Sequence, residues 1–135
     1  MLSGLLMANA TAAEVLADKI RSRSARVGIV GLGYVGLPLA VEFAKAGFQV
    51  TGIDLSERKV RRVNDGDSYV GDVPSSVLCP LVEAGKLHAS TDFDEVAELD
   101  TINICVPTPR CSPHWASSCA ARRKLGRIFG KVVLR

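Results

Sequence analysis

The sequence lacks any apolar run that approaches the roughly 20 residues needed to cross a bilayer, so we expect no membrane-spanning segment. Aromatic residues are also scarce, at 5%, although the hydrophobic fraction is 47%. These two values predict a core built mainly from aliphatic side chains. Residues 1–13 lack the basic start of a secretory signal peptide. We therefore interpret residues 1–25 as a flexible leader and a helix, with Met7 as an alternative start.

Nothing else in the sequence indicates secretion, so we expect its four cysteines to be reduced thiols in a cytoplasmic protein. They are Cys79, Cys105, Cys111 and Cys119. Cys111 and Cys119 flank His114, but this spacing is not a usual zinc pattern and a fourth ligand is missing. We therefore expect no metal site.

Acidic residues are absent from the C-terminal part of the sequence. Residues 110–135 contain 7 Lys and Arg and no Asp or Glu, whereas residues 1–109 contain 10 basic and 14 acidic residues. This change separates a domain at 26–109 from a basic tail at 110–135. Such a tail is compatible with non-specific binding to nucleic acid, but no recognisable module is present, which favours no nucleic-acid partner. We hypothesise that the tail is an out-of-frame or otherwise aberrant end.

Short apolar runs alternate with segments of helical periodicity along the domain. Ser56 is predicted to begin a helix, Gly47 and Gly85 to end helices, and Thr91 or Asp92 to begin a short acidic helix. This order predicts an α/β fold: a Rossmann-like parallel sheet with helices on both faces, incomplete after its fourth strand. The predicted strands are 26–30, 48–53, 87–90 and a buried run at 101–106; the predicted helices are 11–23, 35–46, 56–63, 75–84 and 92–99.

The first predicted strand runs directly into Gly31-Leu32-Gly33-Tyr34-Val35-Gly36, which matches the pattern G-x-G-x-x-G. Gly31 permits a tight turn, Gly33 lets a pyrophosphate approach the backbone, and Gly36 lets the next helix pack closely on the strand. The free N–H groups at the start of that helix carry a partial positive charge that favours phosphate. The loop is therefore predicted to bind a dinucleotide.

Asp54 lies 18 residues after Gly36, at the end of the second predicted strand. A carboxylate there accepts hydrogen bonds from the hydroxyls of the adenosine ribose and repels a 2′-phosphate, which favours NAD over NADP. Two alternatives stay open from the residues alone. FAD-binding proteins use a related glycine pattern, and the glycines and Asp54 can also serve only as turn residues.

The stretch from Val27 to Ala40, VGIVGLGYVGLPLA, resembles the opening of the UDP-glucose/GDP-mannose dehydrogenase family. Residues 52–60 (GIDLSERKV) are similar to the family's second strand and following helix, and residues 105–109 (CVPTP) to the loop after its fourth strand. Three further segments are similar to one branch, the UDP-N-acetylglucosamine 6-dehydrogenases: 66–70 (GDSYV), 73–74 (VP) and 90–93 (STDF).

The resemblance implies an enzyme that oxidises the 6-hydroxyl of a nucleotide sugar to a carboxylate, in two hydride transfers to NAD. It implies that Tyr34 and Val35 belong to the loop around the pyrophosphate and that Lys59 lies near the adenosine ribose. It also implies that the cofactor is lined by Val106, Pro107 and Thr108.

After Pro109 the resemblance stops, before the segments in which the family carries its catalytic cysteine, lysine and asparagine. Cys105 falls within the cofactor half, so we do not assign it as a nucleophile, and no catalytic residue is assigned. We therefore expect no turnover from this chain alone, and weak or absent NAD binding is the alternative. We transfer no oligomeric state from the family, although an uncovered fourth strand favours association.

Overall fold

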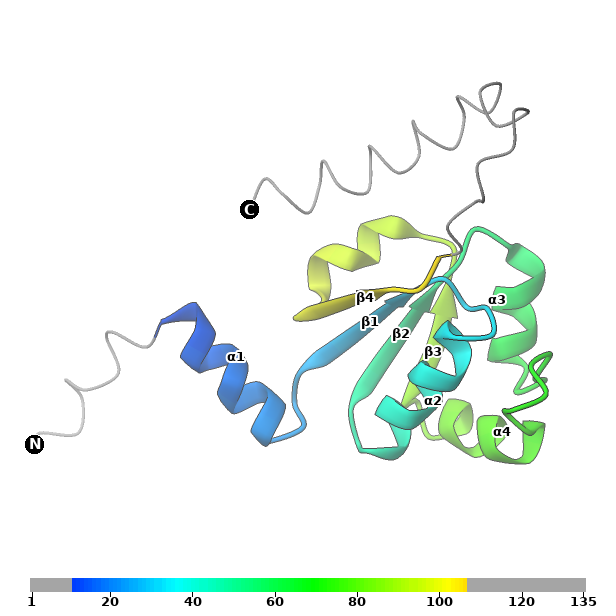
Figure 1. Cartoon of the computed structure of the whole chain (residues 1–135), viewed down its shortest axis with the longest axis horizontal. Helices are drawn as coiled ribbons and strands as arrows, with labels where there is room; N and C mark the ends of the chain where they lie inside the picture. Colours follow the sequence, from blue (N-terminus) through cyan, green and yellow to red (C-terminus); the bar gives the residue numbers. More distant parts are fainter. Residues whose placement is uncertain (1–10, 107–135) are drawn as a thin grey trace, which may run out of the picture.

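The computed structural model describes residues 11–106. Helices and strands alternate along this part of the chain (Figure 1). Three helices follow the first strand before the third strand begins. In order, the elements are α1 (Ala12–Arg21), β1 (Arg26–Val30), α2 (Gly36–Lys45), β2 (Gln49–Ile53), α3 (Glu57–Asn64), α4 (Ser75–Glu83), β3 (Leu87–Ser90), the 3₁₀ helix η1 (Phe93–Glu98) and β4 (Thr101–Ile104).

The four strands form one parallel sheet in the order β3-β2-β1-β4. Val27 of β1 lies between Val50 of β2 and Thr101 of β4. The chain adds strands outward from β1 to β3, then crosses back to place β4 on the other side of β1. Open α/β sheets bind ligands at such a reversal of strand order, outside the carboxyl ends of the strands, which here is the edge formed by the ends of β1 and β4.

Aliphatic side chains fill the core, as the sequence predicts. α2 packs on β1 and β2, and α3 and α4 contact β3 on the same side. η1 joins β3 to β4 in the reverse direction, and right-handed crossover places it on the opposite face; Figure 1 shows it beside β4, away from α2, α3 and α4. The predicted Rossmann-like fold is therefore confirmed. The largest fully buried side chains are Ile29, Leu32, Leu37, Ile53, Leu78, Leu87, Val41, Val50 and Val63.

The predicted helix boundaries follow local chemistry. The Ser56 side chain accepts a hydrogen bond from the Lys59 N–H at the start of α3. Gly47 and Gly85 follow α2 and α4 with φ of 98° and 68°, values that a glycine adopts without strain. The Asp92 carboxylate, rather than Thr91, caps the acidic segment, which forms a 3₁₀ helix.

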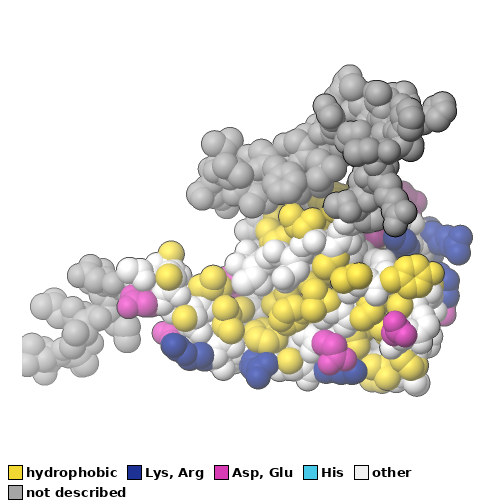
Figure 2. All heavy atoms as spheres, in the orientation of Figure 1, with side chains coloured by type: hydrophobic (Ala, Val, Ile, Leu, Met, Phe, Trp, Pro, Cys, Tyr) yellow, Lys and Arg dark blue, Asp and Glu magenta, His cyan; other side chains and the backbone are white. Residues whose placement is uncertain are grey.

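The prediction that residues 101–106 form a buried strand is wrong in part. β4 ends at Ile104, and its side chains are only half-buried. Ile104 is 46% exposed and Val106 is 42% exposed. The reason is position, because β4 lies at the edge of the sheet and only β1 pairs with it in the described part of the chain. Figure 2 shows apolar side chains over the middle of the visible face, with charged ones toward the rim.

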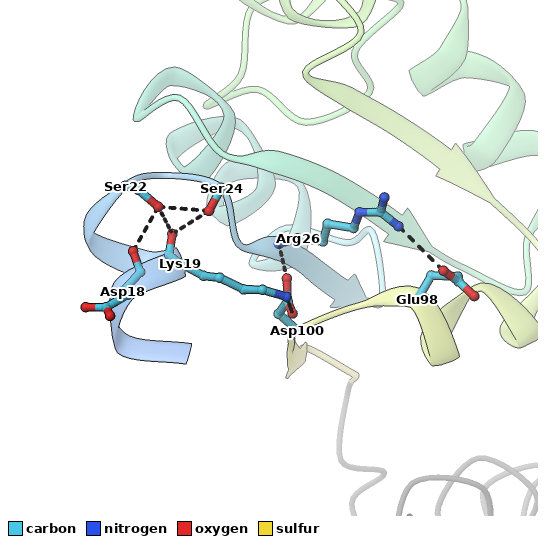
Figure 3. A network of polar contacts seen from close by, with 7 residues as sticks. All are labelled: Asp18, Lys19, Ser22, Ser24, Arg26, Glu98 and Asp100. Atoms are coloured by element: carbon cyan, nitrogen blue, oxygen red, sulfur yellow. Dashed lines mark hydrogen bonds and ion pairs between the residues drawn. The ribbon is translucent and has the colours of Figure 1, made fainter. Parts of the chain in front are cut away.

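α1 lies outside the core, and its attachment to the sheet is polar (Figure 3). The Lys19 ammonium lies 2.6 Å from Asp100 Oδ1, and Asp100 Oδ2 accepts a hydrogen bond from the Arg26 N–H at 2.8 Å. The Arg26 N–H and then the Lys19 ammonium lower the pKa of Asp100 below its usual value. One carboxylate therefore joins α1, the start of β1 and the start of β4.

No helix among residues 11–106 is long and apolar enough to cross a membrane.

Candidate functional site

The three glycines after β1 differ in what surrounds them. Gly31 has φ of 97°, and a Cβ there would collide with the carbonyl oxygen of Cys105. A Cβ on Gly36 would collide with the carbonyl oxygen of Gly31. A Cβ on Gly33, in contrast, would meet no protein atom within 4 Å. Gly31 and Gly36 thus let the backbone pack tightly, whereas Gly33 leaves open space above the loop.

The start of α2 leaves backbone donors free beside that space. The N–H groups of Gly33, Tyr34 and Val35 have no acceptor among residues 11–106. Val35 is the N-cap of α2 and supplies no capping side chain, and the side chains of Tyr34 and Val35 are 80% and 68% exposed. An open position, free N–H groups and the positive end of a helix dipole fit an anionic group such as a pyrophosphate.

Asp54 follows β2 and points back toward the glycine loop. Its Oδ2 accepts a hydrogen bond from the Leu32 N–H at 2.9 Å, and its Oδ1 accepts one from the Ser56 N–H at 2.9 Å. The Lys59 ammonium lies 3.2 Å from Oδ2. The Asp54 side chain is only 12% exposed, whereas that of Lys59 is 40% exposed. The structure therefore brings together the loop, the acid and the lysine that the sequence singles out.

Leu32 contributes to the site through its backbone. Its side chain is fully buried and fills the space that Gly52 leaves, because a Cβ on Gly52 would lie 2.7 Å from Leu32 Cδ2. The Leu32 N–H is bonded to Asp54, and its carbonyl oxygen accepts a hydrogen bond from the Tyr69 hydroxyl. Leu32, which lies between the first two glycines of the pattern, thus anchors the loop.

Tyr69 is the residue of this site that sequence reasoning missed. It lies between α3 and α4 and is 37 residues from Leu32 in the chain. Burial, followed by the negative charge of Asp54, raises the pKa of Tyr69 to about 12, so its hydroxyl is protonated at neutral pH. No spacing rule connects a tyrosine to a distant carbonyl; the available hint was that one of only two tyrosines follows α3.

The end of β4 lies against the glycine loop. Val106 Cγ1 would be 3.4 Å from a Cβ on Gly31, so this predicted cofactor residue lies beside the loop. Pro107 and Thr108 lie outside the described residues, as do Cys111, His114 and Cys119. Cys79 and Cys105 are free thiols. No group of three or more His, Cys, Asp or Glu residues within 11–106 could hold a metal ion.

A family model described as "UDP-glucose/GDP-mannose dehydrogenase family, NAD binding domain" matches residues 25–124. The chain belongs to this family. The matched part is the NAD-binding domain of a nucleotide-sugar dehydrogenase, and its cofactor is NAD rather than FAD. The match continues past Pro109 to residue 124, so a domain end at 109 stays a prediction.

Named nucleotide-sugar dehydrogenases match a similar part of this chain. UDP-N-acetyl-D-mannosamine dehydrogenase of Escherichia coli is 38% identical over 91 residues, which are 67% of this chain and 21% of that protein. UDP-glucose 6-dehydrogenase of Haloferax volcanii is 34% identical over 83 residues, which are 62% of this chain and 19% of that protein. The chain thus spans about one fifth of the length of the curated relatives it matches.

A solved structure agrees with the fold. GDP-mannose dehydrogenase from Pseudomonas aeruginosa, determined as a ternary complex, superposes with a TM-score of 0.60 at 35% identity. The superposition covers 65% of this chain and 21% of that chain. The fold of the family's NAD-binding domain is therefore shown both by sequence and by backbone geometry.

Proposed function

We propose that NAD binds at the carboxyl edge of the sheet, between β1 and β4, with its pyrophosphate over Gly31, Gly33 and Gly36. The observation that carries the proposal is the contrast among these glycines. Two of them are closed in by backbone, whereas Gly33 opens onto free space beside unpaired N–H groups. When bound, NAD supplies a hydride acceptor; the residues described here bind and orient it.

Asp54 is proposed to accept hydrogen bonds from the adenosine ribose hydroxyls, with Lys59 beside it. A carboxylate offers about four lone-pair positions, and Leu32, Ser56 and Lys59 use three of them. A 2′-phosphate would bring a second anion to this largely buried carboxylate, which supports NAD over NADP. Val106, Pro107 and Thr108 are proposed to line the cofactor beyond β4.

For a full-length enzyme that carries such a domain, we propose oxidation of the sugar 6-hydroxyl of UDP-N-acetylglucosamine to the carboxylate. Support for this sugar is the similarity of residues 66–70, 73–74 and 90–93 to one branch of the family. Named relatives act on other sugars, among them UDP-N-acetyl-D-mannosamine, UDP-glucose and GDP-mannose. We assign no catalytic residue within 11–106 and expect no turnover from the 135-residue chain alone.

Calorimetric titration of the 135-residue chain with NAD tests the binding site. Gly33→Ala places a methyl group where the pyrophosphate is proposed to lie, without touching other protein atoms. We expect about tenfold weaker NAD binding, comparable to losing one hydrogen bond to a charged group. The matched control is Gly71→Ala, because a Cβ on Gly71 also meets nothing within 4 Å.

Equal NAD affinity in the two glycine variants would contradict the placement of the pyrophosphate. Absence of any NAD binding by the unaltered chain would favour the alternative, a fragment that does not retain the cofactor. A parallel assay for NADH production with UDP-N-acetylglucosamine tests the expectation of no turnover, and clear turnover would refute it.

A further inference from the structure

The backbone of Leu32 is held from two distant segments. Asp54, after β2, accepts a hydrogen bond from its N–H at 2.9 Å. Tyr69, from the segment between α3 and α4, donates its hydroxyl proton to the Leu32 carbonyl oxygen. The side chain of Leu32 is meanwhile locked in the core over Gly52. Leu32 therefore has no freedom to reorient without breaking a buried contact.

Tyr69 is itself held in place. The Arg62 guanidinium lies over its ring, with Cζ 5.4 Å from the ring centroid. Arg62 is oriented in turn by Asp67, whose Oδ2 lies 2.6 Å from Nε, and by the Ser68 carbonyl oxygen at 3.0 Å from Nη2. The Tyr69 ring also packs against the hydrophobic core. Its hydroxyl thus reaches Leu32 from a side chain that has few alternative conformations.

The bond that joins Leu32 to Gly33 links this anchor to the proposed phosphate site. A trans peptide is planar, so its C=O and N–H point in opposite directions. The carbonyl belongs to Leu32 and the N–H to Gly33. When the Tyr69 hydroxyl fixes the carbonyl direction, it fixes the direction of the Gly33 N–H, which has no protein acceptor within the described residues. Hydrogen bonding at the carbonyl also strengthens the N–H as a donor.

We infer that Tyr69 is a positioning residue for the dinucleotide: its hydroxyl orients the Leu32–Gly33 peptide so that the Gly33 N–H faces the pyrophosphate. This inference rests on the proposed NAD site. It assigns a function to the segment between α3 and α4, which the glycine pattern and Asp54 leave without one. Tyr69 acts through the loop and is not proposed to contact the cofactor.

The test is Tyr69→Phe in the 135-residue chain. This change keeps the ring, its packing and the Arg62 contact, and removes only the hydroxyl. Without NAD, we expect the Leu32 carbonyl carbon and the Gly33 amide nitrogen to shift in NMR spectra. The Leu32 N–H keeps its hydrogen bond to Asp54 in this variant. We nevertheless expect it to exchange with solvent about fivefold faster, because loss of the Tyr69 hydrogen bond to the Leu32 carbonyl oxygen makes local opening of the loop easier.

Ligand affinities distinguish a positioning role of Tyr69 at the pyrophosphate site from a general role in stabilising the fold. We expect Tyr69→Phe to weaken NAD and ADP-ribose, which carry the pyrophosphate, by about fivefold. Adenosine, which lacks phosphate, should keep its affinity within about twofold. The control is Ser68→Ala, which removes a hydroxyl whose hydrogen bonds within residues 11–106 are to Val70 alone. This control should change neither the Leu32 amide nor the NAD affinity.

Three outcomes would overturn the inference. The first is an unchanged Leu32 carbonyl shift and amide exchange in Tyr69→Phe. The second is equal acceleration of exchange at Val50 in β2, which would make Tyr69 a general packing residue. The third is equal loss of affinity for adenosine and NAD. If the unaltered chain binds no NAD, the proposed function fails, whereas the shift and exchange data still decide whether Tyr69 orients the peptide.

Discussion

The two sides of β1 differ sharply in how completely their side chains are buried. Toward β2, Ile29 and Leu32 are fully buried in the core, where α2 packs on β1 and β2. Toward β4 and α1, apolar side chains stay accessible, with Val15 at 45% and Ile104 at 46% exposed. The first side holds the proposed cofactor loop in one conformation by packing. On the second side, β4 pairs with β1 along its length, and Asp100 joins α1 to the start of both strands. The difference separates a fully buried platform beneath the proposed site from a partly exposed border.

Truncation of one large aliphatic side chain on each side would test this contrast most strongly. Leu32→Ala empties a space that Gly52 cannot fill, and we expect it to lower the free energy of unfolding by about 3 kcal/mol. Ile104→Ala removes a half-exposed side chain of β4 and should cost less than about 1 kcal/mol. Urea denaturation measures both values. Equal losses would show that the two sides are equally important to stability.

Adding a methyl group at Gly36 or at Gly33 separates a glycine that the packing of the loop requires from one that opens onto the proposed binding space. In Gly36→Ala the new Cβ meets the Gly31 carbonyl oxygen, so the backbone must shift. We expect a loss of about 2 kcal/mol in the free energy of unfolding. Gly33→Ala meets open space and should change the stability by less than about 0.5 kcal/mol. The same denaturation experiment checks both, and a larger loss in Gly33→Ala would contradict the open position.

Asp100→Asn tests the polar border. The variant removes the negative charge that pairs with Lys19 and weakens the acceptor for the Arg26 N–H. We expect a loss of about 1 kcal/mol in the free energy of unfolding, because the charged hydrogen bonds are partly shielded from solvent. Glu98→Gln serves as the control. Glu98 lies 3.6 Å from Arg26 with its side chain 77% exposed, so its loss should be within about 0.5 kcal/mol. Similar values for the two variants would refute the special role of Asp100.

The smallest expected effect is the pH dependence of the stability that Asp100→Asn loses. The pKa of Asp100 is lowered in the folded protein, first by the Arg26 N–H and then by Lys19. Its stabilising contribution is therefore complete above the ordinary aspartate pKa of about 3.9 and disappears as the pH falls through the lower folded value. The difference between the unaltered chain and Asp100→Asn should be full at pH 6 and smaller near pH 3. A difference that grows on acidification would contradict the sign.

Features that depend on a few neighbouring residues could be predicted from the sequence. Gly47 and Gly85 end helices because the left-handed backbone they adopt is set locally. The position of Asp54 at the end of the second strand follows from its spacing after the glycine pattern, whereas its hydrogen bond to the Leu32 N–H is visible only in the structure. The exposure of Ile104 depends on which elements cover β4. The hydrogen bond from the Tyr69 hydroxyl to the Leu32 carbonyl oxygen joins residues that α2 and α3 separate in the chain. Neither leaves a periodic signal in the residues themselves.

The shared use of Asp54 has a consequence for protein engineering. A designer who wishes to switch the cofactor preference toward NADP would begin by replacing this carboxylate. The replacement would also remove the acceptor of the Leu32 N–H and loosen the loop that we propose to bind the pyrophosphate. A successful redesign must therefore supply a new acceptor for that N–H in the same step. In evolutionary terms, the proposed role of Asp54 at the ribose and its observed bond to Leu32 would make a change of cofactor by one substitution unfavourable.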